Sequence, residues 1–150
     1  MFADQNWDPI QQIVDHLCGH IDGVAGQVEQ LNRIQRDFIY VYDFVVAMND
    51  GGICSYYFNS YGDNAWAAVL ALRMIGANQA ADLLLSSFAV FPNNDPPKSR
   101  EQREKLVAEL PDDQTVFLEE VDDQYERGPF AELEGSLRSY VEQNKNELLS

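Results

Sequence analysis

The sequence contains few cysteines, few basic residues and no long apolar run. Its two cysteines, Cys18 and Cys54, are too few for a disulfide framework and lack CxxC spacing. The longest apolar stretches, around residues 65–72 and 83–91, fall well short of the roughly 18 residues that indicate a membrane span. The N-terminal residues have neither the basic region nor the apolar run of a signal peptide. We therefore expect a soluble cytoplasmic protein with free thiols.

The scarcity of basic residues excludes whole classes of partner. Ten Lys and Arg stand against 25 Asp and Glu, which gives a net charge of −15. Nucleic acids bind proteins through basic surfaces, because their phosphates must be neutralised. Anionic membranes attract basic segments for the same reason. The composition therefore argues against nucleic-acid and membrane binding, and it leaves basic proteins, cations or no partner at all.

The apolar content and the spacing of apolar residues predict an all-α protein. Apolar residues make up 45% of the 150 residues, enough for one domain over 1–150 with a hydrophobic core. The segment Phe38–Tyr42 has strand propensity, but the helical period upstream continues through it. We predict a compact single-domain bundle of about seven or eight helices around a buried central helical hairpin. The predicted helices cover 8–19, about 24–51, 65–75, 80–91, 99–110, 112–127 and 129–148.

Several helix ends carry recognisable signals. Asp63 is the expected cap before residue 65, and Asp112 or Asp113 is the expected cap of the 112–127 helix. Ser99 with Gln102 resembles a capping box. These signals predict where the chain restarts after its turns.

The acidic residues are concentrated in one region. Residues 109–134 carry ten Asp or Glu and one Arg, a local charge of −9. Within the predicted 112–127 helix, Glu119, Asp122, Asp123 and Glu126 fall at i, i+3, i+4 and i+7, which places them on one face. Five like-charge pairs at these spacings destabilise the helix by about 1–2 kcal/mol in total. The preceding helix avoids this repulsion, because its Arg and Lys alternate with Glu.

Two interpretations of the acidic face stay open at this stage. Acidic surfaces keep proteins soluble, and salt-adapted proteins carry many carboxylates and few lysines. Salt adaptation alone, however, would spread the acids evenly over the surface. Carboxylates one helical turn apart are separated by about 5.4 Å, and B-DNA presents one charge per roughly 3.4 Å on each strand. A rigid row of carboxylates can therefore occupy Lys and Arg side chains that otherwise hold phosphates.

The sequence shows no sign of catalysis or of a metal site. His16 and His20 stand four residues apart with Cys18 between them, but Gly19 is expected to end the helix before His20, and no second ligand pair has suitable spacing. No calcium loop, P-loop, G-x-S-x-G or G-x-G-x-x-G motif is present. We expect no enzyme activity, cofactor or metal. The Tyr56-Tyr57-Phe58 cluster is expected to close one end of the core.

That aromatic cluster belongs to a longer pattern that resembles the bacterial DNA-mimic protein family. The resemblance is close over about residues 28–92 and loose over the acidic part. In the family, Asn-Gly-Gly is usually followed by an aromatic residue, whereas Asp50 and Ile53 stand at those positions here. The matching residues are Asn49-Asp50-Gly51-Gly52, Tyr57-Phe58-Asn59-Ser60, Gly62-Asp63, Ala71-Leu72, Ile75-Gly76-Ala77, Ala80-Ala81, Leu83-Leu84 and Phe91-Pro92.

The resemblance implies an all-α fold, a homodimer, and binding to a DNA-binding protein in place of DNA. In the described member of the family, the target is a helix-turn-helix repressor. Together with the charge clustering, it predicts an acidic DNA mimic; the alternative is an immunity-type inhibitor of a basic toxin or nuclease. The predicted partner-binding residues are Asp112, Asp113, Glu119, Glu120, Asp122, Asp123, Glu126 and Glu132.

Overall fold

The computed structural model describes residues 8–21, 28 and 30–150, and this part of the chain is all-α, with nine α-helices and no strand. The prediction of an all-α bundle is confirmed. The helices are α1 (Asp8–Ile21), α2 (Arg33–Gly51), α3 (Ile53–Tyr57), α4 (Ala65–Met74), α5 (Asn78–Ser87), α6 (Arg100–Ala108), α7 (Asp112–Arg127), α8 (Pro129–Gln143) and α9 (Lys145–Leu148).

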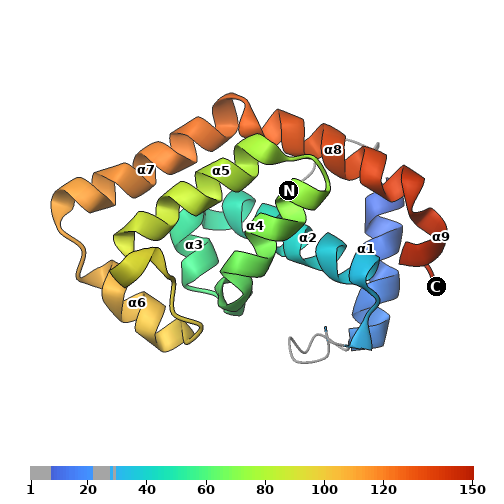
Figure 1. The fold of residues 1–150 in the computed structure, drawn as a ribbon, viewed down its shortest axis with the longest axis horizontal. Helices are drawn as coiled ribbons and strands as arrows, with labels where there is room; N and C mark the ends of the chain where they lie inside the picture. Colours follow the sequence, from blue (N-terminus) through green and yellow to red (C-terminus); the bar gives the residue numbers. More distant parts are fainter. Residues whose placement is uncertain (1–7, 22–27, 29) are drawn as a thin grey trace.

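Figure 1 shows how these helices are arranged. Helices α7 and α8 follow one another along one long edge of the molecule, with α6 near one end and α1 and α9 near the other. The α4–α5 hairpin lies in front of α2 and α3 in this view. None of the described helices is long and apolar enough to cross a membrane.

Helix α2 begins later than the sequence predicts. The apolar period favours a start near residue 24, but residues 28 and 30 are in 3-10 conformation and the helix starts at Arg33. Asn32 explains this start, because its side chain accepts a hydrogen bond from the Gln35 backbone while the Gln35 side chain accepts one from the Asn32 backbone. This capping box fixes Asn32 in an extended conformation. Downstream, Phe38–Tyr42 is helical as predicted.

Two predicted caps and several predicted helix ends are wrong. The first helix continues through Gly19 to Ile21, and α5 runs from Asn78 to Ser87 instead of over 80–91. Asn64 rather than Asp63 precedes α4, and Pro111 rather than Asp112 or Asp113 precedes α7; neither Asn64 nor Pro111 forms a side-chain capping bond. The last helix, predicted over 129–148, is divided into α8 and α9 at Asn144. By contrast, Ser99 does cap α6 by accepting from the Gln102 backbone.

The α4–α5 hairpin is buried on its inner side only. Ala68, Leu72, Ala80 and Leu84 are fully buried in the core. On its outer side α4 exposes Trp66, Leu70 and Met74, at i, i+4 and i+8. The nearly uniform apolar character of the hairpin predicts burial all round, and this outer stripe is where the prediction fails.

The aromatic cluster packs inside the bundle. Tyr56 and Tyr57 are buried, whereas Phe58 is partly exposed. The Tyr56 ring meets Phe44 edge-on with centroids 5.5 Å apart, and the Tyr57 ring meets Phe91 at 4.8 Å. These contacts confirm a core role for the two tyrosines.

The most unusual buried group is Arg103 of α6, whose side chain is 0% exposed. Its Nε donates to the carbonyl of Tyr57, its Nη2 to that of Asn59, and its Nη1 to those of Pro97 and Lys98. Its Nη2 also lies 2.8 Å from Asp63 Oδ1. Arg103 therefore joins α6 to the turn after α3 and to the loop before α6. Since α6 leads directly into α7, this guanidinium fixes where the acidic helix begins.

Candidate functional site

The acidic helix α7 is held to the bundle by a narrow apolar stripe. Leu118, Val121 and Tyr125, at i, i+3 and i+7, are all buried. The Tyr125 ring packs edge-on against Phe44 with centroids 5.8 Å apart, and against Phe130 at 5.6 Å. A helix anchored along one stripe keeps its other faces in solvent. The prediction that α7 is amphipathic is therefore confirmed.

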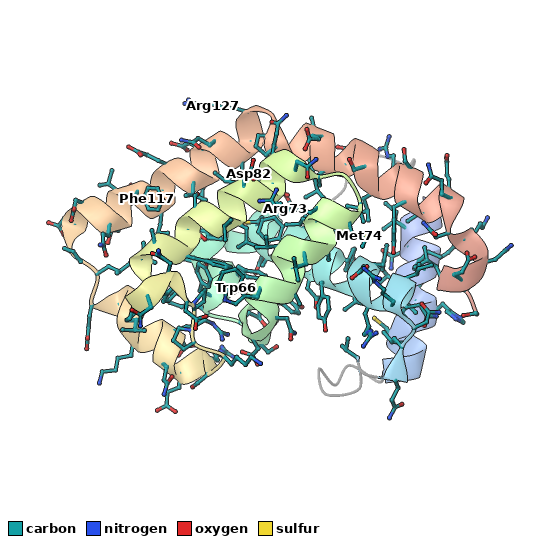
Figure 2. All side chains as sticks on the ribbon, in the orientation of Figure 1. Trp66, Arg73, Met74, Asp82, Phe117 and Arg127 are labelled. Carbon is teal, nitrogen blue, oxygen red and sulfur yellow. The ribbon has the colours of Figure 1, made fainter. Side chains whose placement is uncertain are left out.

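Six of the eight predicted binding residues lie exposed on α7. No ion pair among the described residues involves a carboxylate of α7. The helix has a single basic residue, Arg127 in its last turn, which extends outward at the end of α7 in Figure 2. The outer faces of α7 therefore carry negative charge without local neutralisation. The six exposed residues are Asp112, Asp113, Glu119, Glu120, Asp123 and Glu126.

Asp122 behaves differently from its neighbours, because its side chain turns inward. Its Oδ1 accepts a hydrogen bond of 2.8 Å from the backbone N–H of Ile53, the first residue of α3. Burial raises the pKa of this carboxyl, the bond from Ile53 lowers it, and the charges of Asp123, Glu126 and Glu119 raise it. Asp122 thus joins α7 to α3, and one of its oxygens is not available to a partner.

The approach of Asp122 requires a glycine at position 52. Gly52 has φ of 81°, a left-handed conformation that residues with a Cβ rarely adopt. A Cβ at this position would also collide with the carboxylate of Asp122. The Gly51-Gly52 turn that ends α2 therefore makes room for the acidic helix.

Glu132 of α8 is likewise occupied within the protein. Its Oε1 accepts from the backbone N–H of Gln79 and its Oε2 from the Gln79 side chain, each at 2.9 Å. Gln79 lies in the first turn of α5, where backbone N–H groups have no partner within the helix. Glu132 therefore caps α5 across the helix interface.

The structure brings the predicted residues together in part. Besides the burial of Asp122, the charges of Asp123, Glu126 and Glu119 raise its pKa, so these carboxylates share one local field. Asp112 and Asp113 lie in the first turn, where the helix dipole favours negative charge. At about 1.5 Å per residue, Asp112 and Glu126 are roughly 21 Å apart along the axis. The site is thus a row about two-thirds of a DNA turn in length.

Sequence reasoning missed the internal roles of Asp122, Glu132 and Arg103. For Arg103 the sequence did contain a signal of burial. Arg103 lies three, four and seven residues before Leu106, Val107 and Leu110, which places it on the apolar side of its helix. Such a position predicts a buried charge with partners. For Asp122 a weaker signal existed, because it lies four residues after Leu118 and three before Tyr125, at the edge of the apolar stripe. For Glu132 the sequence carries no such signal.

The sequence gives no reason to expect a metal or cofactor site. Within the described residues, no group of three or more His, Cys, Asp and Glu is placed to hold a metal ion. The side chain of His20, the second half of the His16/His20 pair, lies outside the described part of the chain.

A family model described as DMP19-like protein matches residues 29–144 of this chain. The chain belongs to the DMP19-like protein family. This is a DNA-mimic family, in agreement with the resemblance seen in the sequence. The match includes all of α7 and α8, so it extends beyond the residues 28–92 on which that resemblance rested. No curated protein and no solved structure matched the chain significantly.

We expect Asp122→Ala to lower the free energy of unfolding by about 1–2 kcal/mol, because the Ile53 N–H loses its partner in a partly buried position. Asp123→Ala, which removes the same charge from an exposed position, should change stability by less than about 0.5 kcal/mol. Urea denaturation of both variants measures the difference. Equal effects of the two substitutions would contradict the inward role of Asp122.

Proposed function

We propose that this member of the DMP19-like family binds a basic DNA-binding protein through the exposed carboxylates of α7 and thereby competes with DNA. The observation that carries the proposal is a row of six exposed carboxylates on one packed helix, without an ion pair to another described residue. A fixed row of charges loses little conformational freedom on binding, so charge matching contributes directly to affinity. The protein acts in this proposal by binding, not by catalysis.

The eight predicted residues have unequal parts in this proposal. Glu119, Glu120, Asp123 and Glu126 form the centre of the surface, with Asp112 and Asp113 extending it toward α6. Asp122 and Glu132 support the surface instead, because they hold α7 to α3 and α8 to α5. The helix-turn-helix target, the homodimer and the cytoplasmic location that the sequence predicts remain parts of this proposal.

Competition with DNA tests the proposal. Affinity capture from cell lysate, eluted by raising the salt concentration, supplies the basic partner, and fluorescence anisotropy of its labelled DNA site measures displacement. We expect the variant Glu119→Gln, Glu120→Gln, Asp123→Asn, Glu126→Gln to displace DNA at least about tenfold less effectively at about 0.1 M salt. The difference should shrink at higher salt, because exposed charges are screened.

A matched control separates the effect of the α7 carboxylates on DNA displacement from the effect of the net charge. Asp50→Asn, Glu101→Gln, Glu142→Gln, Glu147→Gln neutralises four exposed carboxylates on other helices, so both variants have a net charge of −11 from −15 + 4. The control is expected to displace DNA within about threefold of the unmodified protein. Equal loss in both variants would show that only net charge matters, and the proposal for α7 would be wrong.

A further inference from the structure

A groove between α2 and α4 has the opposite character to α7. It has a volume of about 610 Å³ and is lined on the α2 side by Arg33, Arg36 and Tyr40, and on the α4 side by Leu70, Arg73 and Met74. Three of the ten basic residues of the chain therefore gather at one place. Among the described residues that line it, Asp37 is the one acid. Arg33 Nε lies 3.9 Å from Asp37 Oδ2, so three arginines against one aspartate leave the lining of the groove with a charge of +2 in a protein of charge −15.

The α4 wall of this groove is an exposed apolar stripe. Leu70 is 67% exposed and Met74 53%. Trp66, four residues before Leu70 and 49% exposed, continues the stripe beyond the lining of the groove, where its Nε1 donates to Asp95 and its ring packs against Phe88. Figure 2 shows Trp66 and Met74 along α4, with Arg73 beside Asp82 of α5. Arg73 Nη2 lies 2.8 Å from Asp82 Oδ1, which orients this guanidinium at the edge of the stripe. Apolar side chains left in solvent beside oriented charges are typical of a protein-binding surface.

We propose that this groove binds an acidic amphipathic helix of another protein. Residues 66–74 extend about 12 Å along the α4 axis, which corresponds to two turns of a partner helix with apolar residues at i, i+3, i+4 and i+7. Carboxylates on the edges of such a helix meet the guanidinium groups of Arg33, Arg36 and Arg73, which suit carboxylates in bidentate geometry. Basic segments are repelled here and drawn to α7.

Two other occupants fit the groove less well. A two-fold dimer through this face would bring the same three arginines of each copy together, since a two-fold interface joins identical surfaces. A nucleic acid would offer phosphates to the arginines but would leave the apolar stripe without a partner, and the net charge of −15 repels a long polyanion. An acidic amphipathic helix satisfies both the arginines and the stripe.

A synthetic peptide provides the test. The probe is a helical peptide of about 16 residues that carries a fluorescein label and a side-chain staple. Leu occupies positions i, i+3, i+4 and i+7 of its apolar face, and Glu occupies the positions that flank this face. Anisotropy at about 0.15 M salt measures its binding to the full chain, and ¹H–¹⁵N NMR spectra locate it. We expect saturable binding that perturbs amides of α2 and α4, and no such perturbation from the same peptide with Lys in place of Glu.

Matched variants decide whether the groove is responsible. Arg33→Glu, Arg36→Glu should weaken binding at least about tenfold, whereas Arg100→Glu, Lys105→Glu, with the same change in net charge on α6, should stay within about twofold. Leu70→Asp, at the most exposed position of the stripe, should also weaken binding at least about tenfold without loss of helicity. No binding, equal effects of the two charge reversals, or a dimer in sedimentation velocity that Leu70→Asp dissociates would each overturn the proposal.

Discussion

Replacement of Arg103 by methionine is expected to lower the free energy of unfolding by about 3–5 kcal/mol, a large effect for a single substitution. The reason is the number of groups that this side chain serves. The carbonyls of Tyr57, Asn59 and Pro97 would lose their charged donor, and Asp63 would lose the cation beside it. Buried acceptors without donors carry their full desolvation penalty. Urea denaturation monitored by circular dichroism measures the change.

Two further substitutions make this expectation specific. Arg103→Lys keeps the charge but cannot replace a guanidinium that donates in several directions, so we expect it to lower stability by about 2–3 kcal/mol. Arg100→Met removes an exposed arginine of the same helix, whose ion pair with Glu104 spans 3.0 Å. That change should stay below about 1 kcal/mol. A stability of Arg103→Met within about 1 kcal/mol of the unmodified protein would show that α6 is held by other contacts.

The second large effect concerns Asp43 of α2. Burial raises the pKa of its carboxyl from 3.8 to about 7. Because the folded protein binds this proton more tightly than the unfolded chain, the stabilisation is fully present below about pH 4 and is lost as the pH rises through about 7. At about 1.4 kcal/mol per pH unit, the loss amounts to about 4 kcal/mol. Unfolding curves from about pH 4 to about pH 8 measure it.

Asp43→Asn isolates this contribution from the repulsion among the other carboxylates. The neutral side chain should stabilise the protein by about 2–4 kcal/mol at about pH 8 and change little at about pH 4. Asp50→Asn removes the same charge from an exposed position at the end of the same helix but keeps Asp43, so it should retain the pH profile of the unmodified protein. Parallel pH profiles for Asp43→Asn and the unmodified protein would refute the assignment.

The surroundings of Asp43 agree with this assignment. The pKa values of Cys18 and Tyr61 are both raised, and the largest cause is their own burial. The second largest cause is the negative charge of Asp43. These two side chains come from α1 and from the turn before α4. Asp43 therefore lies close enough to both elements for its charge to act on them.

The acidic surface of α7 could be predicted because its pattern is local. Apolar Leu118, Val121 and Tyr125 alternate with carboxylates at helical spacing, and that spacing alone assigns the two groups to different faces. The same reasoning places Phe38–Tyr42 correctly in a helix despite its strand propensity. The caps are predicted less well, because the residue beside a helix end can be engaged elsewhere, as Asp63 is with Arg103.

The sequence by itself determined the class of the protein: an all-α chain of −15 net charge with seven of its 25 Asp and Glu residues on one amphipathic helix, and a residue pattern that led to the DNA-mimic family. Only the tertiary structure decided which carboxylates remain free to face a partner. Asp122 and Glu132 are engaged by Ile53 and Gln79, which lie 69 and 53 residues away in the sequence. Such pairings depend on how helices pack against one another, and helical periodicity carries no information about that. The groove that gathers Arg33, Arg36 and Arg73 from two helices could not be predicted for the same reason.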